Sequence, residues 1–217
     1  MFTSDRDGTA DLFWRRSDGT GDAELLYASR YHKDGGSWSP DGKLMAFAEA
    51  NPETAWDIWV LSADSTRGAW PLLQSRFVEH TPMISPNGRW LAYSSDESGR
   101  DEVVVIPFPD GGRKVNVSLE GGTEPLWGRD GRELFYRTGD SVMAVAVTDT
   151  TLFDVGPPEL LFRGAYERRF GFGYPNYDVT PDGERFLMVK EGPAAEGLTR
   201  LNFVLNWFEE LKARVPN

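Results

Sequence analysis

The sequence predicts an all-β fold made of repeated units of four antiparallel strands. One turn sequence, which first reads Ser-Trp-Ser-Pro-Asp-Gly, recurs at a period of roughly 45 residues, over residues 37–47, 83–93, 126–136 and 178–188. Alternating apolar residues, which indicate strands, lie on both sides of each turn. A strand–turn–strand repeat of this length is typical of the blades of a β-propeller.

The turn residues account for the hairpin in each repeat. In the first copy Pro40 fixes φ, Asp41 hydrogen-bonds to nearby backbone, and Gly42 supplies the positive φ that closes the turn. A strand ends at Trp38 and the next begins at Leu44. We therefore expect one shared backbone conformation at the glycines that end the four turns, Gly42, Gly88, Gly131 and Gly183.

The repeat divides the chain into about four to five blades of four strands, inner to outer. The expected boundaries are a partial blade at 1–30, full blades at 31–78, 79–122 and 123–168, and a divergent last blade at 169–217. Residues 1–217 are then a single propeller domain or the C-terminal part of one.

The first blade is predicted to be incomplete. Residues 2–5 match residues 93–96, and residues 11–14 match residues 57–60, so the chain begins within a blade and its two inner strands are absent. The unpaired edge favours pairing with an upstream segment or self-association with a second copy. The alternative is a small ring closed by an unusual pairing.

The C-terminus reads as a strand followed by a short helix. Apolar residues alternate over 201–205, Asn206 is a suitable N-cap, and Pro216 would end the helix.

Composition excludes several kinds of function. A net charge of −11 argues against a duplex nucleic-acid surface, which requires a basic patch, so no nucleic-acid partner is expected. The absence of cysteine excludes disulfides, thiolate metal sites and a cysteine nucleophile. No apolar run approaches the roughly 20 residues of a membrane span. Residues 1–8 lack the features of a signal peptide, so localisation is not established by the sequence.

Catalytic motifs are not found in the sequence. It contains no G-x-S-x-G nucleophile elbow, no glycine-rich phosphate loop and no kinase motif. The two histidines, His32 and His80, do not form a metal-binding pair on a helix. We therefore expect a non-enzymatic protein without a cofactor.

The best candidate site follows from propeller topology. Residues just before each innermost strand gather at one mouth of the central channel. The repeat alignment places there a ring of polar residues, Asp34, His80, Glu124 and Asn176, with Glu79 beside it. Such a ring suits a basic ligand group or a hard divalent cation, although the identity of any metal is unknown. The alternative is a solvated polar rim around a wet channel.

Two arginines and two tryptophans are further candidates. Arg30 and Arg76 occupy equivalent positions, from which they would bind a carboxylate. The alternative for both is a solvent-facing side chain or an ion pair within a blade. Trp56 and Trp70 fall near loops and are candidate anchors for a partner, the alternative being partial burial under a loop.

Three recurrent acids are predicted to have a structural role. Asp11, Asp57 and Asp101 match one another in the repeat alignment. Recurrence in every blade favours backbone hydrogen bonding over catalysis.

These residues carry a resemblance. The W-S-P-D-G-K hairpin of residues 38–43, followed by Asp-Ile-Trp-Val at 57–60, resembles the WD40-like (PD40) repeat of TolB-type propellers. The same repeat occurs in the propeller of dipeptidyl-peptidase-IV-like proteins. Residues 202–211 resemble the end of the C-terminal propeller region of some bacterial serine/threonine kinases. The resemblance implies a periplasmic interaction or sensor module with a protein or small-ligand partner, as part of a larger bacterial protein.

Two hypotheses follow. The first is a non-enzymatic propeller for protein interaction or ligand sensing. The alternative is a propeller enzyme, such as a metal-dependent lyase or lactonase, that uses the polar residues of the channel mouth.

Overall fold

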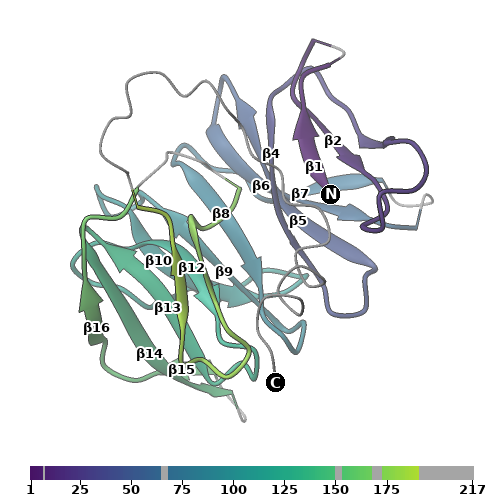
Figure 1. The fold of residues 1–217 in the computed structure, drawn as a ribbon. Coiled ribbons are helices and arrows are strands. Elements are labelled where there is room, and N and C mark those ends of the chain that lie inside the picture. Colours follow the sequence, from purple (N-terminus) through teal and green to yellow (C-terminus); the bar gives the residue numbers. More distant parts are fainter. Residues whose placement is uncertain (7, 65–67, 150–152, 168–172, 191–217) are drawn as a thin grey trace, which may run out of the picture.

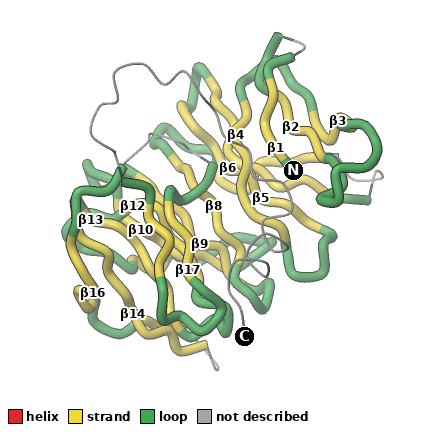
Figure 2. Tube along the Cα trace, in the orientation of Figure 1, coloured by secondary structure: helices red, strands yellow, loops and turns green. Residues whose placement is uncertain are grey.

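A computed structural model describes residues 1–6, 8–64, 68–149, 153–167 and 173–190. These residues form strands and turns and include no helix, so the all-β prediction is confirmed for them (Figures 1 and 2). The strands are β1 (Phe2–Ser4), β2 (Asp11–Trp14), β3 (Glu24–Tyr27), β4 (Lys33–Trp38), β5 (Leu44–Asn51), β6 (Ala55–Ser62), β7 (Ala69–Leu73), β8 (Glu79–Ile84), β9 (Trp90–Ser95), β10 (Glu102–Pro107), β11 (Val115–Asn116), β12 (Thr123–Trp127), β13 (Glu133–Thr138), β14 (Ser141–Asp149), β15 (Phe153–Val155), β16 (Glu159–Arg163), β17 (Tyr177–Val179) and β18 (Phe186–Met188).

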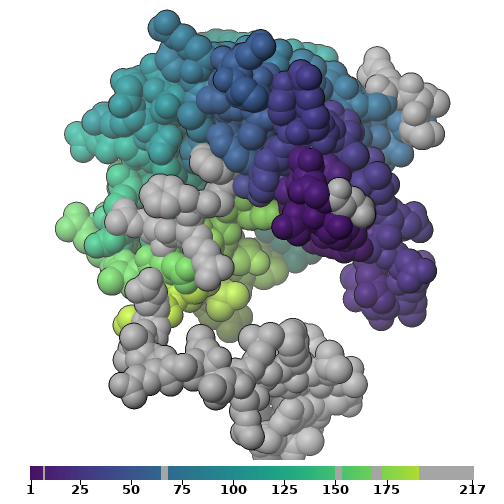
Figure 3. Space-filling model, turned by 90° about the horizontal axis from the view of Figure 1, so that it is seen from above, coloured from purple at the N-terminus to yellow at the C-terminus, as the bar shows by residue number. Residues whose placement is uncertain are grey.

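The strands form five successive antiparallel sheets, which correspond to propeller blades. The first sheet has the order β1-β2-β3, the second β4-β5-β6-β7, and the third β8-β9-β10-β11. The fourth has the order β12-β13-β14, with β15 and β16 both pairing with β14, and the fifth is the pair β17-β18. Figure 3 shows the sheets following one another around an arc, from the purple N-terminus to the green and yellow residues of the fifth sheet.

The hydrophobic core is divided among the junctions between neighbouring sheets. Leu12 of the first sheet packs with Phe47 of the second, and Ile58 of the second packs with Tyr93 of the third. Val105 of the third packs with Leu134 of the fourth, and the fourth sheet packs in turn on Tyr177 of the fifth. The second, third and fourth sheets therefore bury apolar side chains on both faces, which explains the near-continuous apolar runs in their middle strands.

The turn prediction is confirmed. Gly42, Gly88, Gly131 and Gly183 have φ angles of 69°, 73°, 72° and 76°. In the first copy the backbone N–H of Lys43 donates to Asp41 Oδ1 at 3.1 Å, and that of Leu44 donates to Ser39 Oγ at 2.9 Å. The aspartate thus fixes the turn that the glycine closes.

A β-bulge recurs in the innermost strands. The pairing register shifts between Asp34 and Ser37 in β4, between His80 and Met83 in β8, and between Thr123 and Leu126 in β12. Thr81 and Glu124 have positive φ angles of 52° and 56° inside these bulges. Bulges re-aim side chains, and here they do so at the end where the innermost strands begin, which we call the mouth face.

The first sheet corrects one expectation. Residues 2–5 do match the second strand of later blades, and the structure makes them a paired strand, β1, with β2 and β3 beside it. The first sheet therefore contains counterparts of the second, third and fourth strands, and only the innermost strand has no counterpart, not two. Within the described part of the chain, β1 pairs with β2 alone, and β2 has its own chain on both sides.

The predicted C-terminal strand and helix lie outside the described residues.

Of the four tryptophans predicted to be core residues, three are buried or pack against the core. Trp127 is buried and Trp38 and Trp59 pack against the core, but Trp14 is 39% exposed and is not a core residue. Trp70 packs on the core between the second and third sheets, so burial accounts for it. No helix in the described part of the chain is long and apolar enough to cross a membrane.

Candidate functional site at the mouth of the propeller

The mouth face concentrates buried polar side chains. Most of them stand at the beginning of a first or third strand or at the end of a second strand: Asp11, Lys33, Glu49, Asp57, Glu79, His80, Ser95, Glu102, Glu124 and Arg137. The opposite ends of the sheets carry the turns that Gly42, Gly88, Gly131 and Gly183 close. Because alternate strands run in opposite directions, all of these polar positions face the same side of the molecule.

Glu124 and Asn176 lie in contact. The Asn176 backbone N–H donates to Glu124 Oε2 at 2.9 Å, and its side-chain amide donates to Glu124 Oε1 at 3.4 Å. Arg137 Nη1 lies 3.7 Å from Glu124 Oε2, and both side chains are at least nine-tenths buried. Glu124 therefore joins the fourth sheet to the segment leading into the fifth.

Arg137 completes this cluster from β13. Its side chain is 2% exposed. Its guanidinium donates to the backbone oxygens of Glu167 at 2.8 Å and Tyr166 at 3.3 Å. A buried guanidinium needs a carboxylate and several acceptors, and this cluster supplies them.

His80 is held within its own sheet. Its Nδ1 lies 2.9 Å from Thr81 Oγ1, and its Nε2 lies 3.4 Å from Asp101 Oδ1. The imidazole is largely buried, with 11% of the side chain exposed. Its contacts fix the ring between β8 and the loop before β10.

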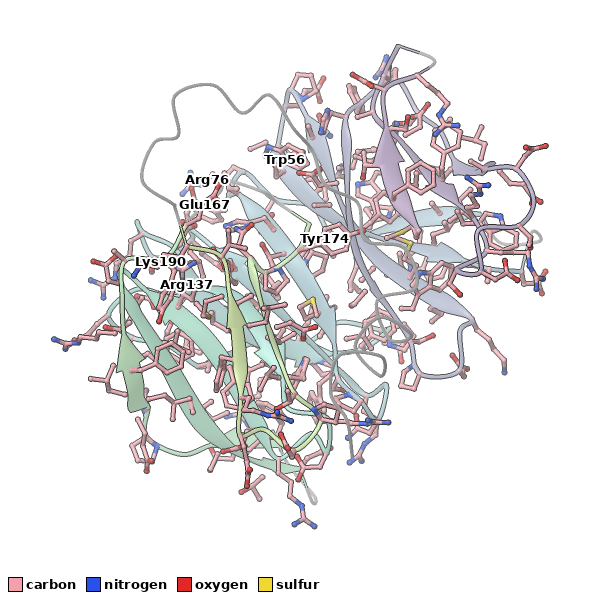
Figure 4. The ribbon with its side chains drawn as sticks, in the orientation of Figure 1. Trp56, Arg76, Arg137, Glu167, Tyr174 and Lys190 are labelled. Carbon is pink, nitrogen blue, oxygen red and sulfur yellow. The ribbon has the colours of Figure 1, made fainter. Side chains whose placement is uncertain are left out.

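Asp34 lies beside a tyrosine that reaches across the channel. Its carboxylate is 3.6 Å from His32 Nε2. Burial, followed by the charge of Asp34, raises the pKa of Tyr174 to about 12. Tyr174 belongs to the segment that leads to the fifth sheet, and Figure 4 shows it close to the second sheet. The backbone of Gly173 lies against that of Gly35.

Glu79 lies between blades, not in the channel lining. It is 1% exposed, and Ser75 Oγ donates to its Oε1 at 2.6 Å. Burial raises its pKa to about 7. The mouth ring of the sequence analysis is thus divided into separate structural contacts. Among the described residues, no three His, Asp or Glu side chains gather where they would hold one metal ion, and the divalent cation remains a prediction.

Arginine and aromatic side chains occupy the outer part of the mouth face. The exposed Arg30 guanidinium lies 4.7 Å from the centre of the Tyr31 ring, and Arg76 lies 5.1 Å from the centre of the Phe77 ring. Trp56 packs edge-on against His32, with 5.6 Å between the centres of the two rings. Arg30, Tyr31, His32 and Trp56 line a groove of about 370 Å³.

Asp11 and Asp57 accept hydrogen bonds from side chains, and not the predicted backbone hydrogen bonds. The predicted alignment of the recurrent acids is also wrong at one position. Strand register places Asp11, Asp57 and Glu102 at one position, because Phe13, Trp59 and Val104 lie opposite the equivalent aromatic residues of the second strands. The assignment of Asp101 to this position is therefore wrong, and Glu102 is the equivalent residue. Asp57 Oδ2 accepts from Thr54 Oγ1 at 2.7 Å, inside the preceding loop.

Comparison with known proteins decides the family. The family model of the TolB beta propeller domain (PD40) matches residues 1–131.

The chain belongs to this family.

Individual relatives agree with this assignment. The Tol-Pal system protein TolB of Actinobacillus succinogenes is 32% identical over 129 residues, which are 58% of this chain and 28% of that protein. The structure of putative TolB from Agrobacterium tumefaciens matches 86% of this chain and 68% of that chain, with 20% identity and a TM-score of 0.63. TolB from Acinetobacter baumannii matches 88% of this chain and 45% of that chain, with 17% identity and a TM-score of 0.66.

The chain spans less than a third of the length of the curated relatives that it matches. The propeller fold also occurs in enzymes: a puromycin-hydrolysing peptidase of Mycobacterium tuberculosis and an oligogalacturonate lyase with manganese have similar structures, at 18% and 12% identity. At such identities the similarity shows the fold alone.

Two mouth residues of this TolB-type propeller, Arg137 and Tyr174, were not predicted from the sequence. Arg137 stands where the second and third sheets have Ala48 and Ser94, and a large charged residue at a small-residue position was a usable signal. Tyr174 lies outside the repeat. The one sequence feature that could have pointed to it is Gly35, which lacks a side chain where the third and fourth blades have Thr81 and Glu124.

Proposed function

We propose that this TolB-type propeller is a non-enzymatic interaction or sensing module that binds a protein partner through its mouth face. One observation carries the proposal. The buried titratable groups of the mouth are engaged in structural contacts, whereas arginine and aromatic side chains are prominent among its exposed and half-buried residues. Figure 4 shows Trp56 and Arg76 toward the upper ends of their sheets, on the same side as Arg137.

The chemistry of the accessible side chains suits a protein interface. Tyr174 is 44% exposed, Arg30 and Arg76 are exposed, and Trp56 is half-buried. Tryptophan, tyrosine and arginine are the residues that contribute most to binding energy at protein interfaces. The groove between Arg30 and Trp56 offers a ring face and a guanidinium to an acidic or aromatic segment of a partner.

The engaged groups support the same proposal. General acid–base catalysis requires a titratable side chain that reaches the reacting group. His80 contacts Thr81 and Asp101, and Glu124 contacts Asn176 and Arg137. Their positions favour a role in joining strands and blades.

The relative named as a Tol-Pal system protein supports a protein partner. We further propose that the module works within a larger bacterial protein, such as a serine/threonine kinase, and outside the cytoplasm. Both points rest on the family resemblance, and the absence of cysteine is compatible with the second.

The metal-dependent enzyme is the alternative, and calorimetry distinguishes the two. Calcium, manganese and zinc are titrated into the purified chain and into His80→Ala and Asp34→Asn variants. The interaction proposal predicts no stoichiometric binding. Tight binding that is lost in both variants, with circular dichroism unchanged, would favour a metal-dependent lyase or lactonase.

A further inference from the structure

Two neighbouring blade junctions carry different charges at the same buried position. Between the first and second sheets, Lys33 Nζ donates to Asp11 Oδ1 at 2.6 Å. The same ammonium donates to the backbone oxygens of Ser29 and Tyr31, at 2.9 and 2.5 Å. The lysine side chain is fully buried and that of Asp11 is 10% exposed. This junction therefore holds a closed ion pair.

The equivalent residues of the next junction are both acidic. Glu79 follows Lys33 by 46 positions, and Asp57 follows Asp11 by 46 positions. β6 packs against β8 as β2 packs against β4. Glu79 is 1% exposed and Asp57 is fully buried. A carboxylate thus stands where the first junction has an ammonium group.

One oxygen of each acid has a partner and the other does not. Glu79 Oε1 accepts from Ser75, and Asp57 Oδ2 accepts from Thr54 and from Gln74 at 3.1 Å. Glu79 Oε2 and Asp57 Oδ1 are buried without a hydrogen-bond partner in the part of the chain that the structure describes. Two buried anionic oxygens without donors would be strongly destabilising, so a proton on Glu79 relieves the conflict.

The surrounding charges do not remove this conflict. Lys114 lowers the pKa of Glu79, but it is paired with Glu97, which raises it. From β5, the buried Glu49 also interacts with Asp57. Tyr93 of β9 has a buried hydroxyl, and its pKa is raised by burial and by the charge of Glu79. Burial is the largest cause of the raised pKa of Glu79, with Asp57 adding to it.

We propose that Glu79 stays protonated in the folded protein, across the junction from the buried Asp57, and that loss of the Glu79 proton weakens the junction between the second and third sheets. The pair acts as a pH-sensitive latch beside the mouth face, because Trp56 and His80 are the chain neighbours of the two acids. This device is independent of the identity of any partner.

The direction of the pH effect follows from linkage. The pKa of Glu79 is raised from 4.5 to about 7 in the folded state. Between these values the folded chain holds a proton that the unfolded chain has released, so stability falls as pH rises through this window. Below pH 4.5 the contribution of Glu79 to the stability of the fold does not change with pH. Above about pH 7 the full loss of stability from ionising Glu79 is present.

Carboxyl NMR and thermal melting test the latch. The ¹³C carboxyl resonance of Glu79, assigned by its loss in Glu79→Gln, should titrate with a midpoint near 7. In melts from about pH 5 to 9, the melting temperature of Glu79→Gln relative to wild type should rise with pH. Glu159→Gln, an exposed substitution on β16, should show no such trend. A Glu79 midpoint near 4.5, or a flat difference, would overturn the proposal.

A second substitution introduces the ion pair of the first junction into the junction between the second and third sheets. Glu79→Lys should form a pair with Asp57 like that of Lys33 with Asp11, and should be more stable than wild type at about pH 8. Should this variant fail to fold, the Glu79→Gln comparison still decides. Calcium chloride added at the same pH should not raise the wild-type melting temperature. A rise that is absent in Glu79→Gln would show that the acids hold a metal ion, which contradicts a protonated Glu79.

Discussion

The phenol of Tyr174 occupies the space in which a side chain at position 35 would begin. A Cβ atom built on Gly35 would lie 1.7 Å from Tyr174 Oη. Gly35 belongs to the innermost strand of the second sheet, whereas Tyr174 lies in the segment that precedes the fifth. This contact joins two parts of the chain across the channel, and it exists because the second blade lacks a side chain where the third and fourth have one.

Replacement of Gly35 by alanine should release Tyr174. The phenol can swing toward solvent, so the loss of stability should be modest, about 1 kcal/mol. The pKa of Tyr174 should fall from about 12 toward its ordinary value, because burial and Asp34 both raise it in the wild type. Ultraviolet titration measures this, with Tyr174→Phe identifying the signal. An unchanged phenol titration in Gly35→Ala would show that the two residues are not in contact.

Replacement of Gly88 by valine should destabilise the second turn. A β-branched residue is strained at a φ of 73°, and the expected cost is about 1–3 kcal/mol. Gly88→Asn is the matched control, because asparagine tolerates this conformation while adding a Cβ near Pro40. Urea denaturation should rank wild type, Gly88→Asn and Gly88→Val in that order of decreasing stability. Equal losses in the two variants would assign the effect to packing and not to backbone strain.

Removal of Glu124 should be among the most destabilising changes at the mouth. Glu124→Ala leaves the buried Arg137 guanidinium without its carboxylate, at an expected cost of about 3–5 kcal/mol. Glu133→Ala, an exposed substitution on the same sheet, should cost far less. Adding Arg137→Met to Glu124→Ala should restore part of the stability. A purely additive double variant would show that the two charges are not coupled.

The turn residue Asp41 should make the fold less stable in acid. Hydrogen bonds from Ser39 and from the backbone of Lys43 lower the pKa of Asp41 below its ordinary 3.8. A group with a lowered folded pKa stabilises above the unfolded value, and this contribution is lost as pH falls through the folded value. Asp41→Asn should therefore flatten the acid limb of the stability curve. The chain contains its own precedent, because Asn87 accepts the same contacts from Ser85 and Arg89 in the next blade. An unchanged acid limb would mean that Asp41 does not contribute.

The fold could be predicted because its signals are local and repeated. Proline, aspartate and glycine act within four residues, so the turn at Ser39–Gly42 is encoded where it forms. Strand alternation then places the partners of each hairpin. The assignment of Asp101 failed since loops of different length separate the strands, and only the pairing of Tyr93 with Val104 identifies Glu102 as the equivalent residue.

The site was less predictable because it depends on contacts between distant segments. The sequence alignment brought Glu124 and Asn176 to one end of the propeller, where they do meet. It could not show that Arg137 neutralises the cluster, nor that residues 166 and 167 supply its acceptors. The symmetry of the ring also implied that equivalent residues would gather at one place. Instead, His80 contacts Thr81 and Asp101, and Glu79 contacts Ser75.

Site-directed photocrosslinking in cells of the source organism tests the central claim most directly. A photoreactive phenylalanine is placed at Trp56 on the mouth face or, as control, at Lys43 on the turn face, where the side chain is 79% exposed. Binding through the mouth face predicts a discrete covalent adduct with a partner protein from position 56 and none from position 43. Adducts from position 43 alone, or equal adducts from both faces, would contradict it.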